Sequence, residues 1–329
     1  MMQDFRRYFF SELEKKNQHP KNKAQILVDD LHLSRSVAYK KVNGSVPMSL
    51  EEVLLLSKKY RISLDAAIAG QEDRVMLRYP ALVGEAMSPW KFVDQLLGVL
   101  TQLSASPNFT IRYTTCEITI FNYLYYPELT ALKFYFYSNS VWNLLGEAQL
   151  GQDWIDTLLA DEAFQAKRMR LFDILANTTT DEYYPTNMLD TTLRQIQFLR
   201  ETKQVTEAFS NTVFAQLKDL TGMLSRWASE GIKQNSEGKP AATFDLYHND
   251  VVFTNIKFLT SNAAGRMLFS TFDSPNFMVC TDERVLDHIE TWFDCLKSKS
   301  IKISKEGEKN RRIFFSEILR RIAEVEQKV

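Results

Sequence analysis

The first seventy residues carry short apolar stripes at helical spacing, separated by polar residues and turn signals. Phe5, Phe9 and Leu13 recur every four residues, which places them along one face of a helix, with arginine and lysine on other faces. Because each stripe covers one face only, the helices are expected to pack around a small common core. The pattern predicts four short helices, over about residues 4–16, 22–31 and 34–43 and from Leu50 onward.

The third of these helices has signals at both ends. The Ser34 hydroxyl can cap its N-terminus, and Gly44 ends it by adopting the left-handed conformation that favours glycine. His32 lies in the tight turn before the helix, so we expect a positive φ there. The inward residues are Val37, Ala38 and Val42. The side chains that face outward are those of Arg35, Ser36, Tyr39, Lys40 and Asn43.

Beyond a polar linker the pattern mixes helical and strand-like stretches. A helix begins at Pro89, and helical periodicity returns over residues 127–145 and 190–232. Residues 109–121 alternate as a strand does, and short apolar runs separated by turn residues follow over 242–280. This succession is typical of a mixed α+β domain.

Two domains are expected, since 329 residues exceed what one hydrophobic core usually organises. The predicted division is an all-α domain over residues 1–70, a linker over 71–88 and a larger α+β domain over 89–329. The larger domain is expected to contain an antiparallel sheet, in the form of a meander, and several amphipathic helices, the last two from Asp282 and from about Lys309.

Two apolar stretches of the larger domain have more than one interpretation. The aromatic run from Phe134 to Tyr137 has the spacing of a helix in a core, which we favour over a cage for a ligand. The stripe that starts at Phe209 and ends at Trp227 fits intramolecular packing, which we favour, or self-association.

Charge is distributed unevenly between the predicted domains. The whole chain has a formal net charge of −1, but residues 1–70 carry 12 basic and 8 acidic side chains, a net charge of +4. A polyanion is therefore attracted to the N-terminal domain more than to the rest of the chain. Residues 297–329 hold 10 basic and 5 acidic side chains, which we interpret as a solvated face rather than a second surface for a polyanion. Arg311, Arg320 and Arg321 belong to this basic segment.

The residues that usually carry catalysis or metal binding form no recognisable motif. The histidines and cysteines lack zinc-ligand spacing, and neither a glycine-rich phosphate loop nor a nucleophile elbow occurs. The pair Asp181-Glu182 is expected to be solvated, and His248 to Asp250 to form a hairpin turn. We therefore expect no enzyme activity, no metal and no cofactor. Scattered cysteines, and the lack of an apolar run of about 18 residues, favour a cytoplasmic protein that does not bind membranes.

Two consecutive segments, LVDDLHLSRSVAYKKVNG and PMSLEEVLLLSKKYRISLD, resemble the helix-turn-helix family of Cro and the phage repressors. The resemblance covers about residues 22–68 and implies that the third helix enters the major groove of double-stranded DNA. It implies base contacts from Arg35, Ser36, Tyr39 and Lys40, and phosphate contacts from Lys23, Gln25, Asn43 and Ser45. The sequence departs from the family at His32, where the turn commonly has glycine, and at Lys41-Val42, where many members have an aromatic residue and a glutamate.

The sequence therefore supports the hypothesis of a sequence-specific transcriptional regulator. Its expected partners are double-stranded DNA, a second copy of the chain bound through the C-terminal domain, and an effector, either a small molecule or a protein. The alternative is a protein-interaction or ligand-sensing module in which the helix-turn-helix serves as a docking unit. DNA binding at low salt separates the two hypotheses.

Overall fold

The computed structural model divides the chain into two compact units, Met1–Met76 and Leu77–Val329. The described residues are 2–17, 22–60, 62, 64, 75–80, 87–144, 151–251 and 256–328, without the side chains of 2–4. The division falls inside the predicted linker over 71–88, of which 71–74 and 81–86 lie outside the described residues. Among the described residues, no helix is both long enough and apolar enough to cross a membrane.

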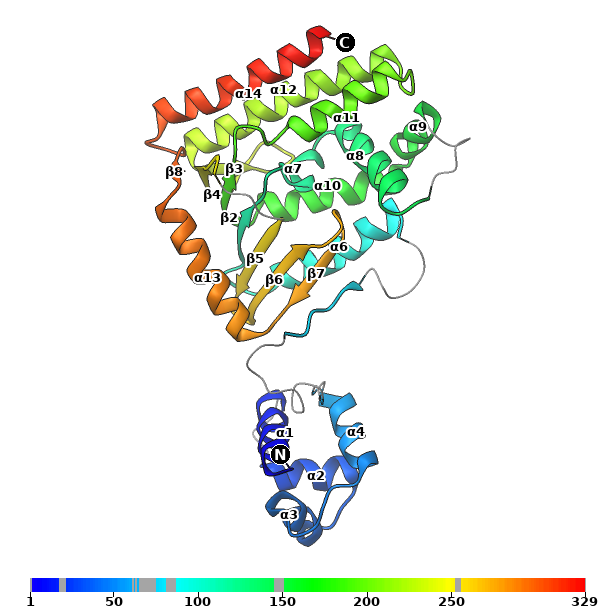
Figure 1. Ribbon diagram of the computed structural model, residues 1–329, viewed down its shortest axis with the longest axis vertical. Helices are drawn as coiled ribbons and strands as arrows, with labels where there is room; N and C mark the ends of the chain where they lie inside the picture. The colour runs from blue at the N-terminus through cyan, green and yellow to red at the C-terminus, as the bar shows by residue number, and fades with distance from the viewer. Residues whose placement is uncertain are drawn as a thin grey trace. The chain divides into compact units, whose positions relative to one another are not determined.

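In the N-terminal unit, the described residues form four short helices around one small core (Figure 1). The helices are α1 (Met2–Lys16), α2 (Lys23–Leu31), α3 (Arg35–Asn43) and α4 (Leu50–Tyr60). Phe9 and Leu13 of α1 are buried together with Ile26 and Leu27 of α2 and Leu56 of α4. The apolar stripes therefore meet in a common core, as their spacing predicts.

Local signals fix both ends of α3. The Ser34 hydroxyl accepts a hydrogen bond from the Val37 amide at 3.4 Å, and Gly44 ends the helix with a φ of 81°. His32 ends α2 with a φ of 52°, in the left-handed region. The predicted cap, stop and turn are confirmed. Arg6 of α1 lies over Gly44, so a Cβ at this position would overlap the Arg6 guanidinium.

Lys41 connects the end of α3 to the start of α4. Its side chain is buried and donates to the Pro47 carbonyl at 2.9 Å and to Glu52 Oε2 at 2.8 Å. Glu52 and Ser49 form a capping box, in which the Ser49 amide donates to Glu52 Oε2 at 2.7 Å and the Glu52 amide to Ser49 Oγ at 3.2 Å. The sequence pattern does not place Lys41 on the inward face of α3. Its burial depends on acceptors at Pro47 and Glu52, which come later in the chain.

The C-terminal unit is organised around one mixed sheet, to which the described residues contribute eight strands. The strands are β1 (Thr110–Thr114), β2 (Thr179–Tyr184), β3 (Ile232–Gln234), β4 (Pro240–His248), β5 (Lys257–Asn262), β6 (Gly265–Thr271), β7 (Phe277–Cys280) and β8 (Ile301–Lys302). β4, β2 and β1 are parallel neighbours, and β5, β6 and β7 continue the sheet from β1 in antiparallel pairs. β3 and β8 pair antiparallel with β4.

The prediction of an antiparallel sheet is wrong for β1, β2 and β4. The predicted meander over 242–280 exists only for β5 to β7, because β2 and β1 lie between β4 and β5 in the sheet. The sequence pattern does not predict β2, β3 or β8, and the missing strand that alters the order of the sheet is β2, whose segment TTDEYY carries two acidic residues. His248 is consequently the last residue of β4 and pairs with β2, so His248 to Asp250 do not form the predicted hairpin turn. The coarser prediction of a mixed domain with helices and a sheet is confirmed.

Helices cover both faces of this sheet (Figure 1). They are α6 (Pro89–Ser104), α7 (Ile120–Tyr123), α8 (Pro127–Ser140), α9 (Gln152–Ala160), α10 (Glu162–Ala176), α11 (Asp190–Glu201), α12 (Glu207–Glu230), α13 (Glu283–Ser298) and α14 (Glu308–Lys328). α13 covers one face, where Phe293 packs with Tyr183 and Tyr247. The opposite face, with Tyr184 and Phe244, lies against the main core, to which most of the other helices contribute.

Both ambiguous apolar stretches lie in the main core. The stripe from Phe209 to Trp227 runs along α12 and is buried, so intramolecular packing of this stripe is confirmed. Phe134 and Tyr135 of α8 are completely covered, as expected for a helix inside a core. The apolar positions of α12 are consequently occupied by contacts within the unit.

Candidate nucleic-acid interface

α3 presents a polar and basic face to solvent. The side chains of Arg35, Ser36, Tyr39 and Lys40 are all exposed, and 52% of the Tyr39 surface is accessible. Residues four apart lie on one row of a helix, so Arg35 and Tyr39 share a row and Ser36 and Lys40 share the next. The four side chains expected to contact bases therefore form one continuous surface.

The charge of this surface is positive. α3 has the sequence RSVAYKKVN, with three basic residues and no acidic one. Lys41 is paired with Glu52 inside the unit, which leaves Arg35 and Lys40 as the cations of the exposed face. Within the part of the chain that the structure describes, the side chains of Arg35 and Lys40 make no ion pair or hydrogen bond. Both charges can therefore meet an anionic partner without first breaking an internal contact.

The four residues expected to contact phosphates are placed less uniformly. Asn43 and Ser45 are exposed at the C-terminal end of α3, about 12 Å along the helix axis from Arg35. Lys23 Nζ lies 3.1 Å from a glutamate of α1, and the Gln25 amide donates at 2.8 Å to an aspartate one turn further along α2. These two carboxylates compete with a phosphate for Lys23 and Gln25.

The basic C-terminal segment differs from α3 because its arginines already have partners within the unit. Arg311 is buried and donates to two backbone carbonyls of the preceding loop, at 3.0 and 2.8 Å. Arg320 and Arg321 hold the Glu317 carboxylate between them and lower its pKa to about 2. The predicted solvated face is wrong for Arg311, since its guanidinium closes the end of a loop. Ion pairs also reduce the positive potential of this segment, which weakens the case for a second DNA contact.

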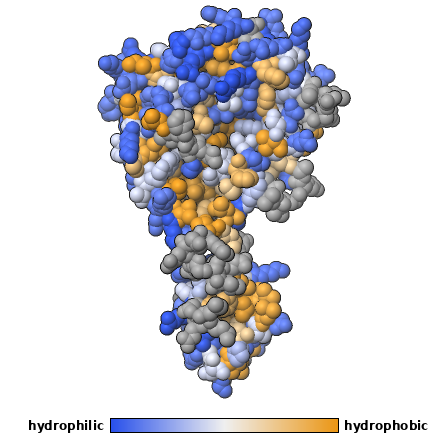
Figure 2. Space-filling model, in the orientation of Figure 1, coloured by the Kyte–Doolittle hydropathy of each residue, from blue (hydrophilic) through white to orange (hydrophobic). Residues whose placement is uncertain are grey.

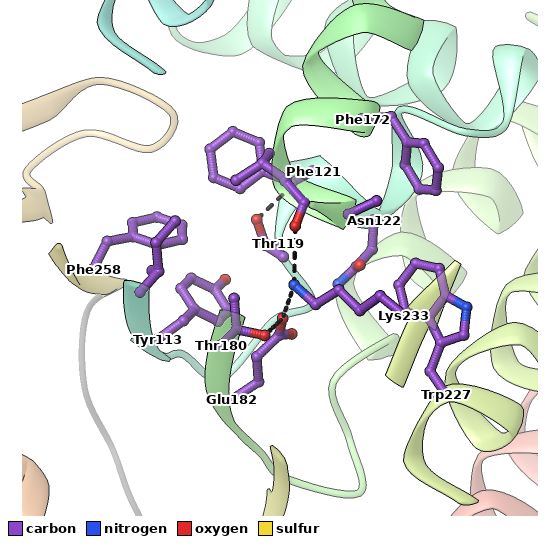
Figure 3. A pocket seen from close by; sticks show the side chains of 13 residues that line it. Tyr113, Thr119, Phe121, Asn122, Phe172, Thr180, Glu182, Trp227, Lys233 and Phe258 are labelled. Carbon is purple, nitrogen blue, oxygen red and sulfur yellow. Dashed lines mark hydrogen bonds and ion pairs between the residues drawn. The ribbon is translucent and has the colours of Figure 1, made fainter. Parts of the chain in front are cut away.

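The C-terminal unit has a small, partly open pocket between the sheet and helices α7, α10 and α12 (Figure 3). Aromatic rings from both strands and helices line it, and Lys233 of β3 and Glu182 of β2 are its charged residues. The cavity volume is about 30 Å³, which is room for roughly two water molecules and too little for a metabolite.

Lys233 is buried among oxygen acceptors. Nζ donates to the carbonyls of Leu175 and Thr178, both at 3.1 Å, and lies 3.6 Å from Glu182 Oε1. The two carbonyls lie at the end of α10, so the lysine completes the hydrogen bonding of that helix terminus. Burial lowers the pKa of Lys233 to about 8, although the attraction of the Glu182 carboxylate opposes this shift.

The prediction of a solvated Glu182 is wrong. Its Oε1 accepts a hydrogen bond from the Thr180 hydroxyl at 2.9 Å, and its Oε2 accepts one from the Tyr184 hydroxyl at 2.7 Å. These residues alternate along β2 and so share the face toward the main core. Asp181 points to the opposite face and pairs with Lys297 at 2.9 Å. The spacing Thr-x-Glu-x-Tyr is a local signal for this arrangement. It places the three side chains on one face only if the segment is a strand.

A second buried lysine, Lys133 of α8, is held in a similar way. Its ammonium contacts Glu117, donates to Gln195 Oε1 at 2.9 Å and lies 3.4 Å from Thr192 Oγ1. An ammonium has three protons to donate, so Lys133 uses all of its protons on the fold, whereas Lys233 donates two to carbonyls and pairs with Glu182 by charge. Among the described residues, no group of three histidine, cysteine, aspartate or glutamate side chains is arranged to hold a metal ion.

Comparisons with protein-family models, with curated proteins and with solved structures find no match to this chain. The choice among functions therefore depends on the residues themselves. The α3 surface is open to a macromolecule, whereas the pocket around Lys233 is small and the charged groups that line it are already paired.

Proposed function

We propose that this chain is a cytoplasmic, sequence-specific DNA-binding regulator of transcription, in which α2 and α3 form a helix-turn-helix and α3 enters the major groove. The observation that carries the proposal is the exposed face of α3, where Arg35, Ser36, Tyr39 and Lys40 lie on adjoining rows without an acidic neighbour in the helix. The net charge of +4 over residues 1–70 adds a long-range attraction to DNA.

Each side chain of this face has a chemical role in the proposal. The Arg35 guanidinium donates two hydrogen bonds to the O6 and N7 atoms of a guanine. The hydroxyls of Ser36 and Tyr39 bond base edges or phosphates, and the Lys40 ammonium contacts a base edge while it reduces the charge of the backbone. Because Arg35 and Ser36 begin the helix, they reach deepest into the groove.

Backbone contacts then orient α3 on the duplex. Asn43 and Ser45, at the far end of α3, bond one stretch of phosphates, and Lys23 and Gln25 join them after they release their carboxylates. One helix offers little contact area for strong specificity, so a second copy of the chain on a second half-site is part of the proposal. The C-terminal unit is proposed to contribute to dimerisation and to respond to an effector.

The test uses the full-length chain and a DNA site selected from a random duplex pool. Arg35→Ala is expected to weaken binding to that site by about 1–3 kcal/mol and to leave binding to unrelated duplexes nearly unchanged. Lys40→Ala should lower the slope of log K against log salt by about one, because one fewer phosphate is neutralised. Arg320→Ala is the matched control, since it removes an arginine whose charge is already paired in the C-terminal unit.

Two results would contradict this proposal. An equal loss of affinity on every sequence with Arg35→Ala would show that Arg35 does not contact bases. Failure of the wild-type chain to bind any duplex at low salt would favour the competing function, in which the N-terminal unit docks to another protein.

A further inference from the structure

α4 carries three exposed leucines on the N-terminal unit. Leu50 is 69% exposed, and Leu54 and Leu55 are each 50% exposed. Figure 2 shows apolar side chains gathered on the surface of this unit, in a protein whose other large apolar residues are mostly buried. Three leucines on a helix of 11 residues form a contiguous apolar face, which in a folded protein usually marks a contact with another surface.

Two charged residues frame this face along the helix. Glu51 and Lys58 are both exposed, and they lie seven residues apart, which is about two helical turns. Leu54 and Leu55 lie between them, one turn from each, so the four side chains occupy one side of α4. Neither Glu51 nor Lys58 forms an ion pair within the described residues of the N-terminal unit. The backbone amide of Glu51 and the Ser49 hydroxyl lower the pKa of Glu51, which is therefore charged at neutral pH.

We propose that this face of α4 binds the same face of a second copy of the chain, with the two α4 helices antiparallel about a two-fold axis between Leu54 and Leu55. In this arrangement Glu51 lies opposite the partner's Lys58, Leu54 lies opposite the partner's Leu55, and Leu50 lies at the edge of the interface. The pattern is self-complementary, as an isologous interface requires.

The charges of α4 select this direction. Glu51 in its first turn and Lys58 in its last turn are the charges that remain for a partner, since Glu52 pairs with Lys41 and Lys59 pairs with Asp30. A parallel pair would place like charges side by side, whereas an antiparallel pair places each acidic end beside a basic end and also opposes the helix dipoles. This pattern fits a second copy of α4 better than a partner of uniform charge.

The interface deepens the proposed function but can be tested without it. A pair of N-terminal units joined through α4 would carry two α3 helices, as a DNA site with two half-sites requires. Self-association is a property of the protein alone, and it is measured in the absence of DNA. Failure of the dimer and failure of DNA binding are therefore separate results.

The experiment compares charge reversals in the full-length chain by sedimentation equilibrium. Glu51→Lys and Lys58→Glu should each raise the dimer dissociation constant by about tenfold, because each change creates two repulsive pairs per dimer. The double variant, Glu51→Lys with Lys58→Glu, should return the constant to within about threefold of wild type. Leu54→Asp should raise the constant by more than either charge reversal does. The matched controls are Glu237→Lys and Lys239→Glu, which reverse an exposed ion pair of the C-terminal unit and should leave the constant unchanged.

Thermal unfolding of each variant separates the interface from helix stability. Each reversal places an unfavourable charge at an end of α4, so both single variants and the double variant should be less stable than wild type. Only the double variant should recover association. A monomeric wild type, a dimer that no α4 variant weakens, or a double variant as weak as the single variants would overturn the proposal. The first two results would mean that another part of this chain or a different partner covers the leucines.

Discussion

The exposed basic residues of α3 and the buried lysines of the C-terminal unit are two opposite uses of the same kind of side chain. Arg35 and Lys40 extend into solvent from a helix whose buried residues are Ala38 and Lys41. Lys233 lies in the interior of the C-terminal unit with a glutamate and two carbonyls as partners. The first arrangement leaves the charge for another molecule, and the second uses it to complete the fold.

The energetic consequences of the two arrangements differ in the same way. A surface cation contributes little to folding, so α3 can carry Arg35 and Lys40 without a structural role for either. A buried lysine is tolerated only with good partners, and loss of one partner leaves an uncompensated charge or unpaired carbonyls. Substitutions in the two units should consequently separate binding from stability.

The largest expected effect is on the stability of the C-terminal unit. Lys233→Met should lower its free energy of unfolding by about 3–5 kcal/mol, because Glu182 and two carbonyls at the end of α10 lose their partner. Lys239→Met is the matched control, since the Lys239 side chain is 72% exposed and pairs with an exposed glutamate, and it should change stability by less than about 0.5 kcal/mol. Urea unfolding followed by tryptophan fluorescence measures both, since all five tryptophans follow residue 77. Equal effects would show that Lys233 is no more important than a surface lysine.

A smaller effect is expected from pH. The pKa of Lys233 is about 8 in the folded chain, below the ordinary lysine value of 10.5. Between these values the unfolded chain binds more protons at this residue than the folded chain, so the contribution of Lys233 to stability rises with pH. From pH 8 to pH 10 the difference in unfolding free energy between wild type and Lys233→Met should widen by about 2 kcal/mol. The same urea titrations measure it, and a constant difference over this range would contradict the shifted pKa.

Sequence patterns predicted the N-terminal unit better than the C-terminal unit for a physical reason. The ends of α3 are set by Ser34 and Gly44, which act on backbone groups only a few residues away. The left-handed turn at His32 is also local. Such signals can be recognised in one segment without knowledge of the rest of the fold. The burial of Lys41 could not be predicted this way, because it depends on acceptors that follow α3 in sequence.

In the C-terminal unit, the decisive contacts join distant segments. The strand β2 is stabilised by β1 and β4, which are about 65 residues away on either side, and its own sequence resembles a polar loop. Without β2, β4 is placed next to β5 and the sheet is predicted as antiparallel. Glu182 then has no predicted partner, since Lys233 comes from yet another strand. Local sequence patterns do not contain the order of the strands in a sheet. Both errors, the antiparallel sheet and the solvated Glu182, therefore have the same cause.

The smallest expected effect compares two serine caps, one in each unit. The Ser34 hydroxyl accepts from the Val37 amide at 3.4 Å, and the Ser88 hydroxyl accepts from the Lys91 amide at 3.3 Å at the start of α6. Replacement of either serine by alanine should cost about 1 kcal/mol. The measurement is hydrogen exchange of the amides in the first turn of each helix, and each variant should accelerate exchange in its own unit.

The two caps should differ in their effect on DNA binding. Ser34 holds the turn from which Arg35 and Ser36 extend, so its loss increases the disorder of the two residues proposed to reach deepest into the groove. Ser34→Ala should therefore weaken binding to the selected DNA site by up to about fivefold, within the roughly 1 kcal/mol that the cap contributes, whereas Ser88→Ala should leave it unchanged. If Ser88→Ala weakens DNA binding as much as Ser34→Ala does, the C-terminal unit takes part in DNA recognition, and the separation of binding from folding between the two units is incorrect.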